Sequence, residues 1–313
     1  MEMANHWTRP NLLATTVRVA EPNDKPDIMY LLQHSRYQHL HLDWQPPADW
    51  VGKRGFVVLP RTESAKQTLT NRLFAAPSRL AACLAAVADP APAAWVRIAC
   101  LGEVPAPKEV LAALMEEVVT GLLSTAVPET AVSELGWLAV EPWPNQWLPA
   151  LGFNIANEIE TYVKTGLEIP NVPISEQLTI RPAQLADMVA LAEIEKQAFA
   201  PLWRHSASGL GMAFQQAFSF DVAEWNGRIV GFQFSTRNHN SAHLARMTVS
   251  PAAQRCGVGS TLLTHILKTC REYNLHYISL NTQIDNKTSQ KLYTKFGFHP
   301  RGQRLPVWVR QIG

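Results

Sequence analysis

The sequence contains few cysteines and no long apolar run. Its 313 residues include four cysteines, none of them in a CxxC pair. This favours neither a zinc site nor a disulfide framework and is typical of a protein of the reducing cytoplasm. Nowhere do about eighteen apolar residues follow one another, and the first residues lack the charged and apolar regions of a secretion signal. We therefore expect a cytoplasmic protein without a membrane span.

Charge is also sparse. Charged residues make up 17% of the chain and the formal net charge is +2, so no broad basic surface argues for a nucleic-acid partner. The hydrophobic share of 47% is that of a globular protein. Because 313 residues exceed what one hydrophobic core usually organises, we expect two domains.

The boundary between the domains is predicted in the segment 166–176, which contains two prolines and a glycine. This divides the chain into domains 1–170 and 175–313. In the second domain, Asn226-Gly227 between two apolar runs predicts a tight β-hairpin. The Ser- and Gly-rich stretch Ser206–Gly211 is expected to be a mobile connection.

Hydrophobic periodicity in the second domain predicts alternating strands and helices. The strands are expected at 178–181, 220–225, 229–235, 241–249, 277–282 and 306–311, and the helices at 184–199, 259–273 and 287–296. This order predicts an α+β fold, a mixed and mostly antiparallel sheet flanked by helices, with one parallel crossover.

The first domain resembles a blurred copy of the second. Strands are expected at 15–20, 54–59, 80–88, 94–101, 132–140 and 158–164, and helices at 27–37 and 108–123. The segment LPALGF at 148–153 aligns with YTKFGF at 293–298. We interpret this as an internal duplication, which would make the chain a monomer with an internal pseudo-dimer.

The strongest chemical signal is the loop 249–260, VSPAAQRCGVGS, between a strand and an amphipathic helix. A helix start offers unpaired N–H groups and the positive end of the helix dipole, which suit a pyrophosphate. Gly257 and Gly259 let the backbone approach an anion, Arg255 adds charge, and Ser260 can donate a hydrogen bond. The loop lacks the GxxxxGK[ST] pattern of a nucleotide-binding P-loop.

Two ordered motifs carry a resemblance to a known family. V-x-P-x-x-Q-R-x-G-V-G at 249–259 resembles motif A of the GNAT (Gcn5-related N-acetyltransferase) superfamily. The segment 286–298, NKTSQKLYTKFGF, is similar to that family's N-x-x-A/S-x-x-L-Y-x-x-x-G-F motif. The resemblance implies two GNAT-like domains and transfer of an acetyl group from acetyl-CoA to an amine, directly within a ternary complex. The alternative is a non-catalytic acyl-CoA sensor or scaffold.

The resemblance also assigns cofactor-binding residues by position. It places the backbone of Met247, Thr248 and Val249 along the pantetheine arm of coenzyme A. Asn286 and Ser289 would lie near the pantetheine and adenosine. The residues expected around the pyrophosphate are Gln254, Arg255, Cys256, Gly257, Val258, Gly259 and Ser260.

Tyr293 is the candidate general acid, because the resemblance places it beside the acetyl thioester. A phenol is neutral at pH 7 and can protonate the leaving thiolate. The alternative is a core aromatic residue on an amphipathic helix.

The general base is less well defined, because the strand 241–247 carries no carboxylate. A period of two places His243, Ala245, Met247 and Val249 on one face of that strand, which makes His243 the candidate proton acceptor. A satisfied structural histidine is the alternative interpretation. Three other residues remain candidates for the base: Glu224, Asp221 and His239.

The first domain lacks this machinery. After Leu101 the loop contains two prolines and no arginine, and Leu148 stands where the second domain has Tyr293. We expect a degenerate domain with a structural or substrate-capturing role, whose tryptophans (44, 50, 137, 143 and 147) lie in the core or at the domain interface. Residues that could shape the acceptor pocket are Phe199, Trp203, Phe214 and Arg246. The sequence does not distinguish a small-molecule amine from a peptide as acceptor.

Overall fold

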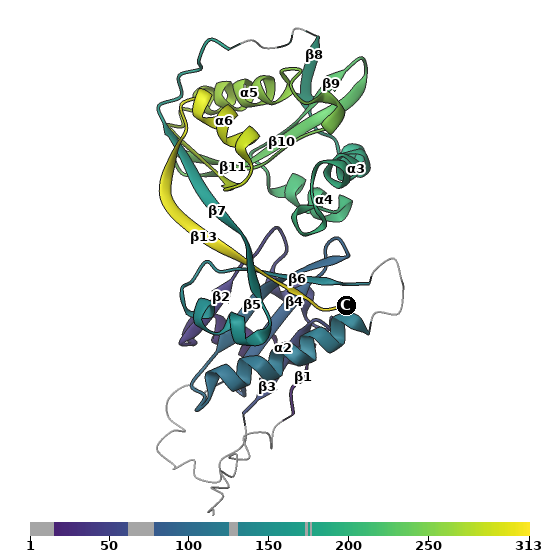
Figure 1. Cartoon of the computed structure of the whole chain (residues 1–313), viewed down its shortest axis with the longest axis vertical. Helices are drawn as coiled ribbons and strands as arrows, with labels where there is room; N and C mark the ends of the chain where they lie inside the picture. Colours follow the sequence, from purple (N-terminus) through teal and green to yellow (C-terminus); the bar gives the residue numbers. More distant parts are fainter. Residues whose placement is uncertain (1–15, 62–77, 125–130, 173–174, 176) are drawn as a thin grey trace, which may run out of the picture.

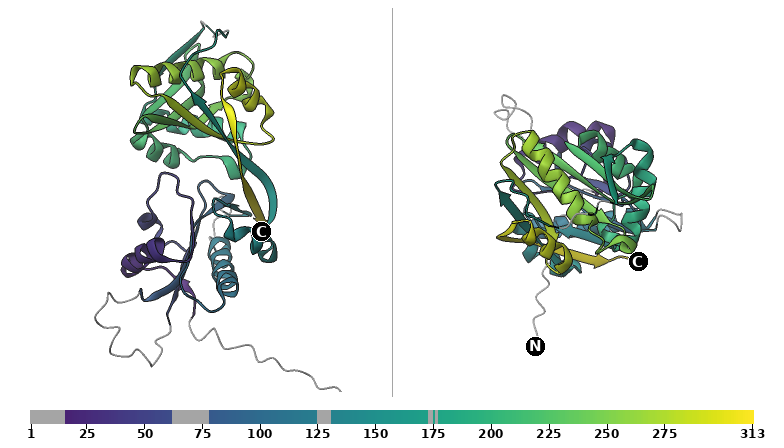
Figure 2. Two further views of the ribbon diagram at one scale, coloured as in Figure 1. Left: turned by 90° about the vertical axis from the view of Figure 1, so that its left-hand side faces the viewer. Right: turned by 90° about the horizontal axis from the view of Figure 1, so that it is seen from above.

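The computed structural model describes residues 16–61, 78–124, 131–172, 175 and 177–313. They form two lobes, which are joined by the long strands β7 (Asn154–Thr165) and β13 (His299–Gln311) that cross between them (Figures 1 and 2). One sheet of thirteen strands runs through both lobes in the order β1-β3-β4-β5-β6-β13-β7-β12-β11-β10-β9-β8, with β2 attached to β5. Among the described residues, no helix is long and apolar enough to cross a membrane.

The second lobe follows the predicted order closely. Its strands are β8 (Leu178–Pro182), β9 (Ser219–Trp225), β10 (Arg228–Asn238), β11 (Ser241–Val249) and β12 (Tyr277–Gln283), and its helices are α3 (Met188–Ala198), α4 (Ala207–Gln216), α5 (Val258–Glu272) and α6 (Lys287–Lys295). Asn226 and Gly227 have φ of 51° and 73°, which confirms the tight hairpin. The β11–β12 pair is parallel, as predicted for the crossover through α5.

The expectation for one segment of this lobe is wrong. The stretch Ser206–Gly211 is not a mobile connection but the start of α4. The Ser206 hydroxyl accepts a hydrogen bond from the Gly209 N–H at 2.9 Å and so caps the helix. Leu210 and Ala213 then pack into the core formed with α3. The cap and the apolar spacing outweigh the low helix propensity of the glycines.

The first lobe repeats the arrangement of the second. Its strands are β1 (Arg18–Val19), β2 (Tyr37–Leu40), β3 (Phe56–Pro60), β4 (Leu80–Val87), β5 (Ala93–Leu101) and β6 (Glu134–Leu138), and its helices are α1 (Lys25–His34) and α2 (Pro107–Leu123). Strands β5 and β6 are parallel and connected through α2, as β11 and β12 are through α5. The predicted α+β class, a mixed sheet flanked by helices, is confirmed.

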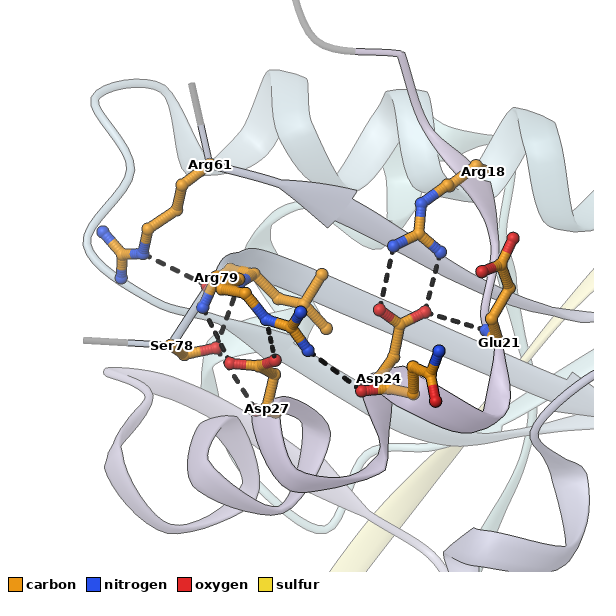
Figure 3. A network of polar contacts seen from close by, with 9 residues as sticks. Arg18, Glu21, Asp24, Asp27, Arg61, Ser78 and Arg79 are labelled. Carbon is orange, nitrogen blue, oxygen red and sulfur yellow. Dashed lines mark hydrogen bonds and ion pairs between the residues drawn. The ribbon is translucent and has the colours of Figure 1, made fainter. Parts of the chain in front are cut away.

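The same ion-pair motif occurs near the start of each half of the chain. The Arg18 guanidinium holds the Asp24 carboxylate through two hydrogen bonds of 2.7 and 2.8 Å, and that carboxylate also accepts from the backbone N–H three residues before it (Figure 3). Arg181 holds Asp187 in the same way, at 2.8 and 3.1 Å, again with a backbone N–H three residues earlier. The same residue spacing and the same bonds support an internal duplication.

The two Gly-Phe pairs aligned in the sequence also adopt the same turn. Each glycine has φ of 81°, a conformation that favours glycine. In the pair 152–153 the phenylalanine N–H donates to the Leu148 carbonyl at 3.1 Å, and in the pair 297–298 it donates to the Tyr293 carbonyl at 3.0 Å. The turn therefore fixes the same chain direction after the short 3-10 helix Leu148–Leu151 and after α6.

The last strand of each half lies in the sheet of the other. β7 pairs with β12 in the second lobe, while β13 pairs with β6 in the first. Accordingly Tyr162 belongs to the second core and Trp308 to the first. Neither half of the sequence therefore contains all the strands of one lobe.

His39 on β2 gives the fold a pH dependence. Its side chain is 1% exposed, and among the described residues its Nδ1 has no hydrogen-bond partner. Burial lowers the pKa of His39 to about 3, helped by the neighbouring His41 and Arg97. Above the unfolded pKa of about 6.5, both states are neutral and the full stability is present. Below it, the unfolded chain binds a proton that the folded chain excludes, so stability falls.

We expect His39 alone to remove about 2 kcal/mol from the free energy of unfolding between pH 7 and pH 5. Urea denaturation at both pH values measures this loss. In His39→Gln the slope of the free energy of unfolding against pH is expected to decrease by the equivalent of about one bound proton. His276→Gln, at an exposed position, is the control and should keep the wild-type slope. An unaltered slope in His39→Gln would contradict the assignment.

Candidate active site

A slot opens between β11 and β12 in the second lobe. The two strands pair only from Ser241 to Leu244 and from Tyr277 to Leu280. Directly beyond, the β10–β11 register shifts, because Phe234 pairs with Arg246 and Ser235 with Leu244, which leaves Ala245 as an extra residue on β11. This bulge marks the point where β11 and β12 separate.

A pocket of about 590 Å³ lies at this slot, which is the usual size range for a small-molecule site. One group of lining residues comes from β11, from the loop that follows it, and from the first turn of α5. A second group comes from the start of α6 and the end of β12. Phe199, Ala200 and Trp203, which follow α3, complete the wall.

The first turn of α5 supplies the anion-binding part of this pocket. Gly257 is the N-cap residue, with φ of 84° and no side-chain cap, and the first helical hydrogen bond is from Thr261 N–H to the Gly257 carbonyl at 2.9 Å. The N–H groups of residues 258–260 therefore precede the helical ladder. A Cβ on Gly259 would lie 3.0 Å from the Leu292 side chain, so a side chain there would crowd the contact between α5 and α6.

Most of the predicted cofactor residues line the pocket. They are Met247, Val249, Gln254, Arg255, Gly257, Val258, Gly259, Ser260, Asn286 and Ser289. Thr248 and Cys256 do not: the Thr248 hydroxyl is buried against Glu195, and Cys256 is exposed. The Asn286 side-chain oxygen caps α6 by accepting from the Ser289 N–H at 3.1 Å.

Tyr293 is buried behind the pocket wall. Burial raises the pKa of Tyr293 to about 12, although the positive charge of Arg246 and the neighbouring Ser289 oppose that rise. Its ring contacts those of Tyr162 and Phe298, with centroids 6.4 and 6.0 Å apart. The hydroxyl therefore keeps its proton at neutral pH.

His243 does not share a face with Met247 and Val249, so this prediction is wrong. Leu244 and Met247 both pack against the apolar side of α5, because the extra residue Ala245 reverses the alternation between them. His243 consequently lies on the opposite side of the sheet from α5, where its Nδ1 is 2.9 Å from the Ser279 hydroxyl. Burial lowers the pKa of His243.

The three alternative bases do not line the pocket. Glu224 pairs with Arg181 at 2.8 Å. Asp221 accepts hydrogen bonds from Gln233 at 2.6 Å and from Ser219 at 2.5 Å. His239 lies in the turn between β10 and β11, with φ of 47°.

An ion pair beside the pocket was not foreseen from the sequence. Glu195 on α3 is fully buried and pairs with Arg246 on β11. Burial alone would raise the pKa of Glu195, but the charge of Arg246, together with hydrogen bonds from Arg246 and Thr248, outweighs it and holds that pKa below its usual value. The Arg246 guanidinium stacks 3.9 Å from the centre of the Phe199 ring and donates to the Trp203 carbonyl at 2.6 Å. One glutamate in an amphipathic helix gives no sequence signal of this role.

Known proteins resemble the second half in sequence and the whole chain in fold. Residues 188–298 match the family model described as Acetyltransferase (GNAT) family. An uncharacterized N-acetyltransferase of Methanocaldococcus jannaschii is 29% identical over 129 residues, which is 40% of this chain and 80% of that protein. A putative [ribosomal protein bS18]-alanine N-acetyltransferase of Bacillus subtilis is 25% identical over 125 residues, 40% of this chain and 83% of that protein.

Two solved structures match nearly the whole chain. A GCN5-related N-acetyltransferase from Sphaerobacter thermophilus has a TM-score of 0.60 at 17% identity and covers 97% of both chains. A tandem GNAT protein from the clavulanic acid biosynthesis pathway has a TM-score of 0.55 at 14% identity, covering 96% of this chain and 99% of that one. At these identities the similarity shows the fold alone, which is two GNAT-like lobes in tandem.

The fold is thus a tandem GNAT arrangement, and its slot lies in the second lobe. Residues 188–298 form a GNAT acetyltransferase domain.

Proposed function

We propose that the second lobe transfers an acetyl group from acetyl-CoA to an amine, by direct transfer in a ternary complex. The observation that carries this proposal is the pocket itself, which extends from the unpaired N–H groups at the start of α5 to the aromatic residues Phe199 and Trp203. Between Val249, beside the anion site, and Arg246, beside the aromatic residues, β11 spans about 10 Å. One pocket can therefore hold the pyrophosphate at one end and the acceptor at the other.

The free edge of β11 supports the proposed path of the cofactor. Beyond Leu244 the β12 side of β11 has no strand partner among the described residues. The amide groups of a pantetheine arm can fill this edge as an added strand. The Arg255 side chain and the first turn of α5 would hold the pyrophosphate.

The proposed chemistry uses two residues near the end of the slot. The neutral acceptor amine attacks the thioester carbonyl, and the departing thiolate takes a proton. His243 stays the proposed proton acceptor, because its lowered pKa leaves the imidazole neutral at pH 7. Tyr293 is the proposed donor, because its raised pKa keeps the hydroxyl protonated.

We further propose that the first lobe binds no coenzyme A, because its slot is already filled. Strand β5 carries a bulge at Arg97, the counterpart of Ala245, and its parallel pairing with β6 ends at Trp95. On the edge beyond, residues 98–101 pair with β2. The indole N–H of Trp143 also bonds to β2, because it donates to the Gln38 carbonyl at 2.7 Å.

A panel of amines tests the proposed function. Release of free thiol from acetyl-CoA would be measured with spermidine, kanamycin and a peptide with an N-terminal alanine. The peptide is included because of the Bacillus subtilis relative's description. Thiol release that depends on the amine supports acetyl transfer, whereas tight acetyl-CoA binding without thiol release on a broad panel favours the sensor.

Arg255→Ala is expected to weaken acetyl-CoA binding about tenfold, because one charge-assisted contact with the pyrophosphate is lost. Titration calorimetry measures this change and, for the wild type, a stoichiometry of one cofactor per chain. Arg271→Ala, at an exposed position in the last turn of the same helix, is the matched control and should leave the affinity unchanged. Two sites per chain would contradict the filled first slot.

A further inference from the structure

The acceptor end of the pocket is formed by a short connection, residues 199–206 between α3 and α4, which we name the acceptor loop. Phe199, Ala200 and Trp203 of this loop line the pocket. Within the loop, the Trp203 N–H bonds the Ala200 carbonyl at 3.0 Å and the Arg204 N–H bonds the Pro201 carbonyl at 3.2 Å. These two bonds make one tight turn, and the Arg204 side chain adds a third bond within the loop by donating to the Phe199 carbonyl at 2.8 Å.

The first lobe holds this turn from outside. The indole N–H of Trp95, on β5, donates to the Leu202 carbonyl at 2.8 Å, and its ring meets that of Trp203 edge to face with centroids 5.6 Å apart. Leu202 is 6% exposed and packs in a cluster with Trp95 and Val307 from the first lobe. Trp95 thus contacts both the backbone of the loop and the side chain that lines the pocket.

Leu202 approaches the first lobe closely at a glycine. A Cβ added to Gly136, on β6, would lie 2.7 Å from the Leu202 methyl group Cδ1. On the other side the Arg246 guanidinium holds the Trp203 carbonyl. The turn is therefore held from both sides. Arg246 holds it from the second lobe, which carries the proposed chemistry, and Trp95 holds it from the first lobe, which lacks the proposed catalytic residues.

We propose that the first lobe supports the acceptor loop and that Trp95 is the principal residue that positions this loop. Trp95 does not line the pocket; it acts by fixing Leu202 and Trp203. This inference rests on the proposed function for the identity of the acceptor end, but the order of the loop can be measured without any acetyl transfer.

Hydrogen exchange of Trp95→Phe tests the proposal. Phenylalanine keeps an aromatic ring but loses the N–H bond, so the Trp203 and Arg204 amides are expected to exchange about five- to tenfold faster than in the wild type. The matched control is Trp308→Phe, since Trp308 is 8% exposed against 9% for Trp95 and its indole also donates one bond, to the Asn145 side chain at 2.7 Å. The control should leave the loop amides unchanged.

Kinetics provide the second readout. With the amine that the panel identifies, Trp95→Phe is expected to raise the acceptor KM about five- to tenfold and to leave the acetyl-CoA Kd unchanged. Unchanged loop exchange in Trp95→Phe, or equal changes in Trp308→Phe, would overturn the proposal. If no amine is acetylated but the loop amides respond as expected, the proposed function fails and the support of the loop by Trp95 stands.

Discussion

Glu195→Ala is expected to lower the free energy of unfolding by about 3–5 kcal/mol, the usual result of breaking a buried ion pair on one side. The substitution leaves the Arg246 guanidinium, whose side chain is 14% exposed, without its counter-charge. The Thr248 hydroxyl and the His205 N–H also lose the oxygen to which they donate. Urea denaturation at pH 7 measures the loss.

Two variants separate this charge effect from a change in the helix. Glu193→Ala lies on the same helix, where Glu193 is exposed and accepts one hydrogen bond, from Gln197 at 3.3 Å; it should change stability by less than about 0.5 kcal/mol. The double variant Glu195→Leu with Arg246→Met removes both charges and should regain most of the loss. A loss below about 1 kcal/mol in Glu195→Ala would mean that Arg246 finds another partner.

A pH–rate profile should distinguish the proposed roles of His243 and Tyr293. Wild-type kcat is expected to rise with pH through a pKa below the ordinary imidazole value of about 6.5, because His243 must be neutral to accept a proton. His243→Ala should lose this limb and about 100-fold in kcat. Tyr293→Phe should lose about 100-fold evenly from pH 6 to pH 9, since a pKa of about 12 keeps the hydroxyl protonated throughout.

The acetyl-CoA Kd should stay within about twofold in both variants, because neither side chain belongs to the proposed pyrophosphate site at the start of α5. His276→Ala and Tyr273→Phe, at exposed positions, are the controls and should keep wild-type kcat. Wild-type kcat in Tyr293→Phe would make Tyr293 a core aromatic residue. Wild-type kcat in His243→Ala would leave the base to water or to the acceptor itself.

The sequence predicted those features that depend on local pattern. The loop 249–260 and the helix start at 286 were found because glycine, arginine and cap residues occur at fixed spacings there, and the structure places most of them on one pocket. The hairpin at Asn226-Gly227 was found for the same reason. The cap at Ser206 was equally local but was missed, because the glycines after it suggested mobility.

The features that depend on partner strands were not predictable from periodicity. The bulge at Ala245 arises from the register of β10 against β11, and a period of two applied across it assigned His243 to the wrong face. Strand β2 escaped notice because the helix predicted at 27–37 ran into it, although it pairs with a distant strand. Glu195 and Arg246 are 51 positions apart in the sequence, and only the packing of α3 on the sheet brings their side chains together.

The exchange of β7 and β13 also governs the order in which the chain can fold during synthesis. Residue 134 pairs with residue 311, so the sheet of the first lobe stays one strand short until β13 has left the ribosome. Contacts between residues so distant in sequence are slow to form. The first half, although translated first, therefore cannot complete its sheet until β13 has been made.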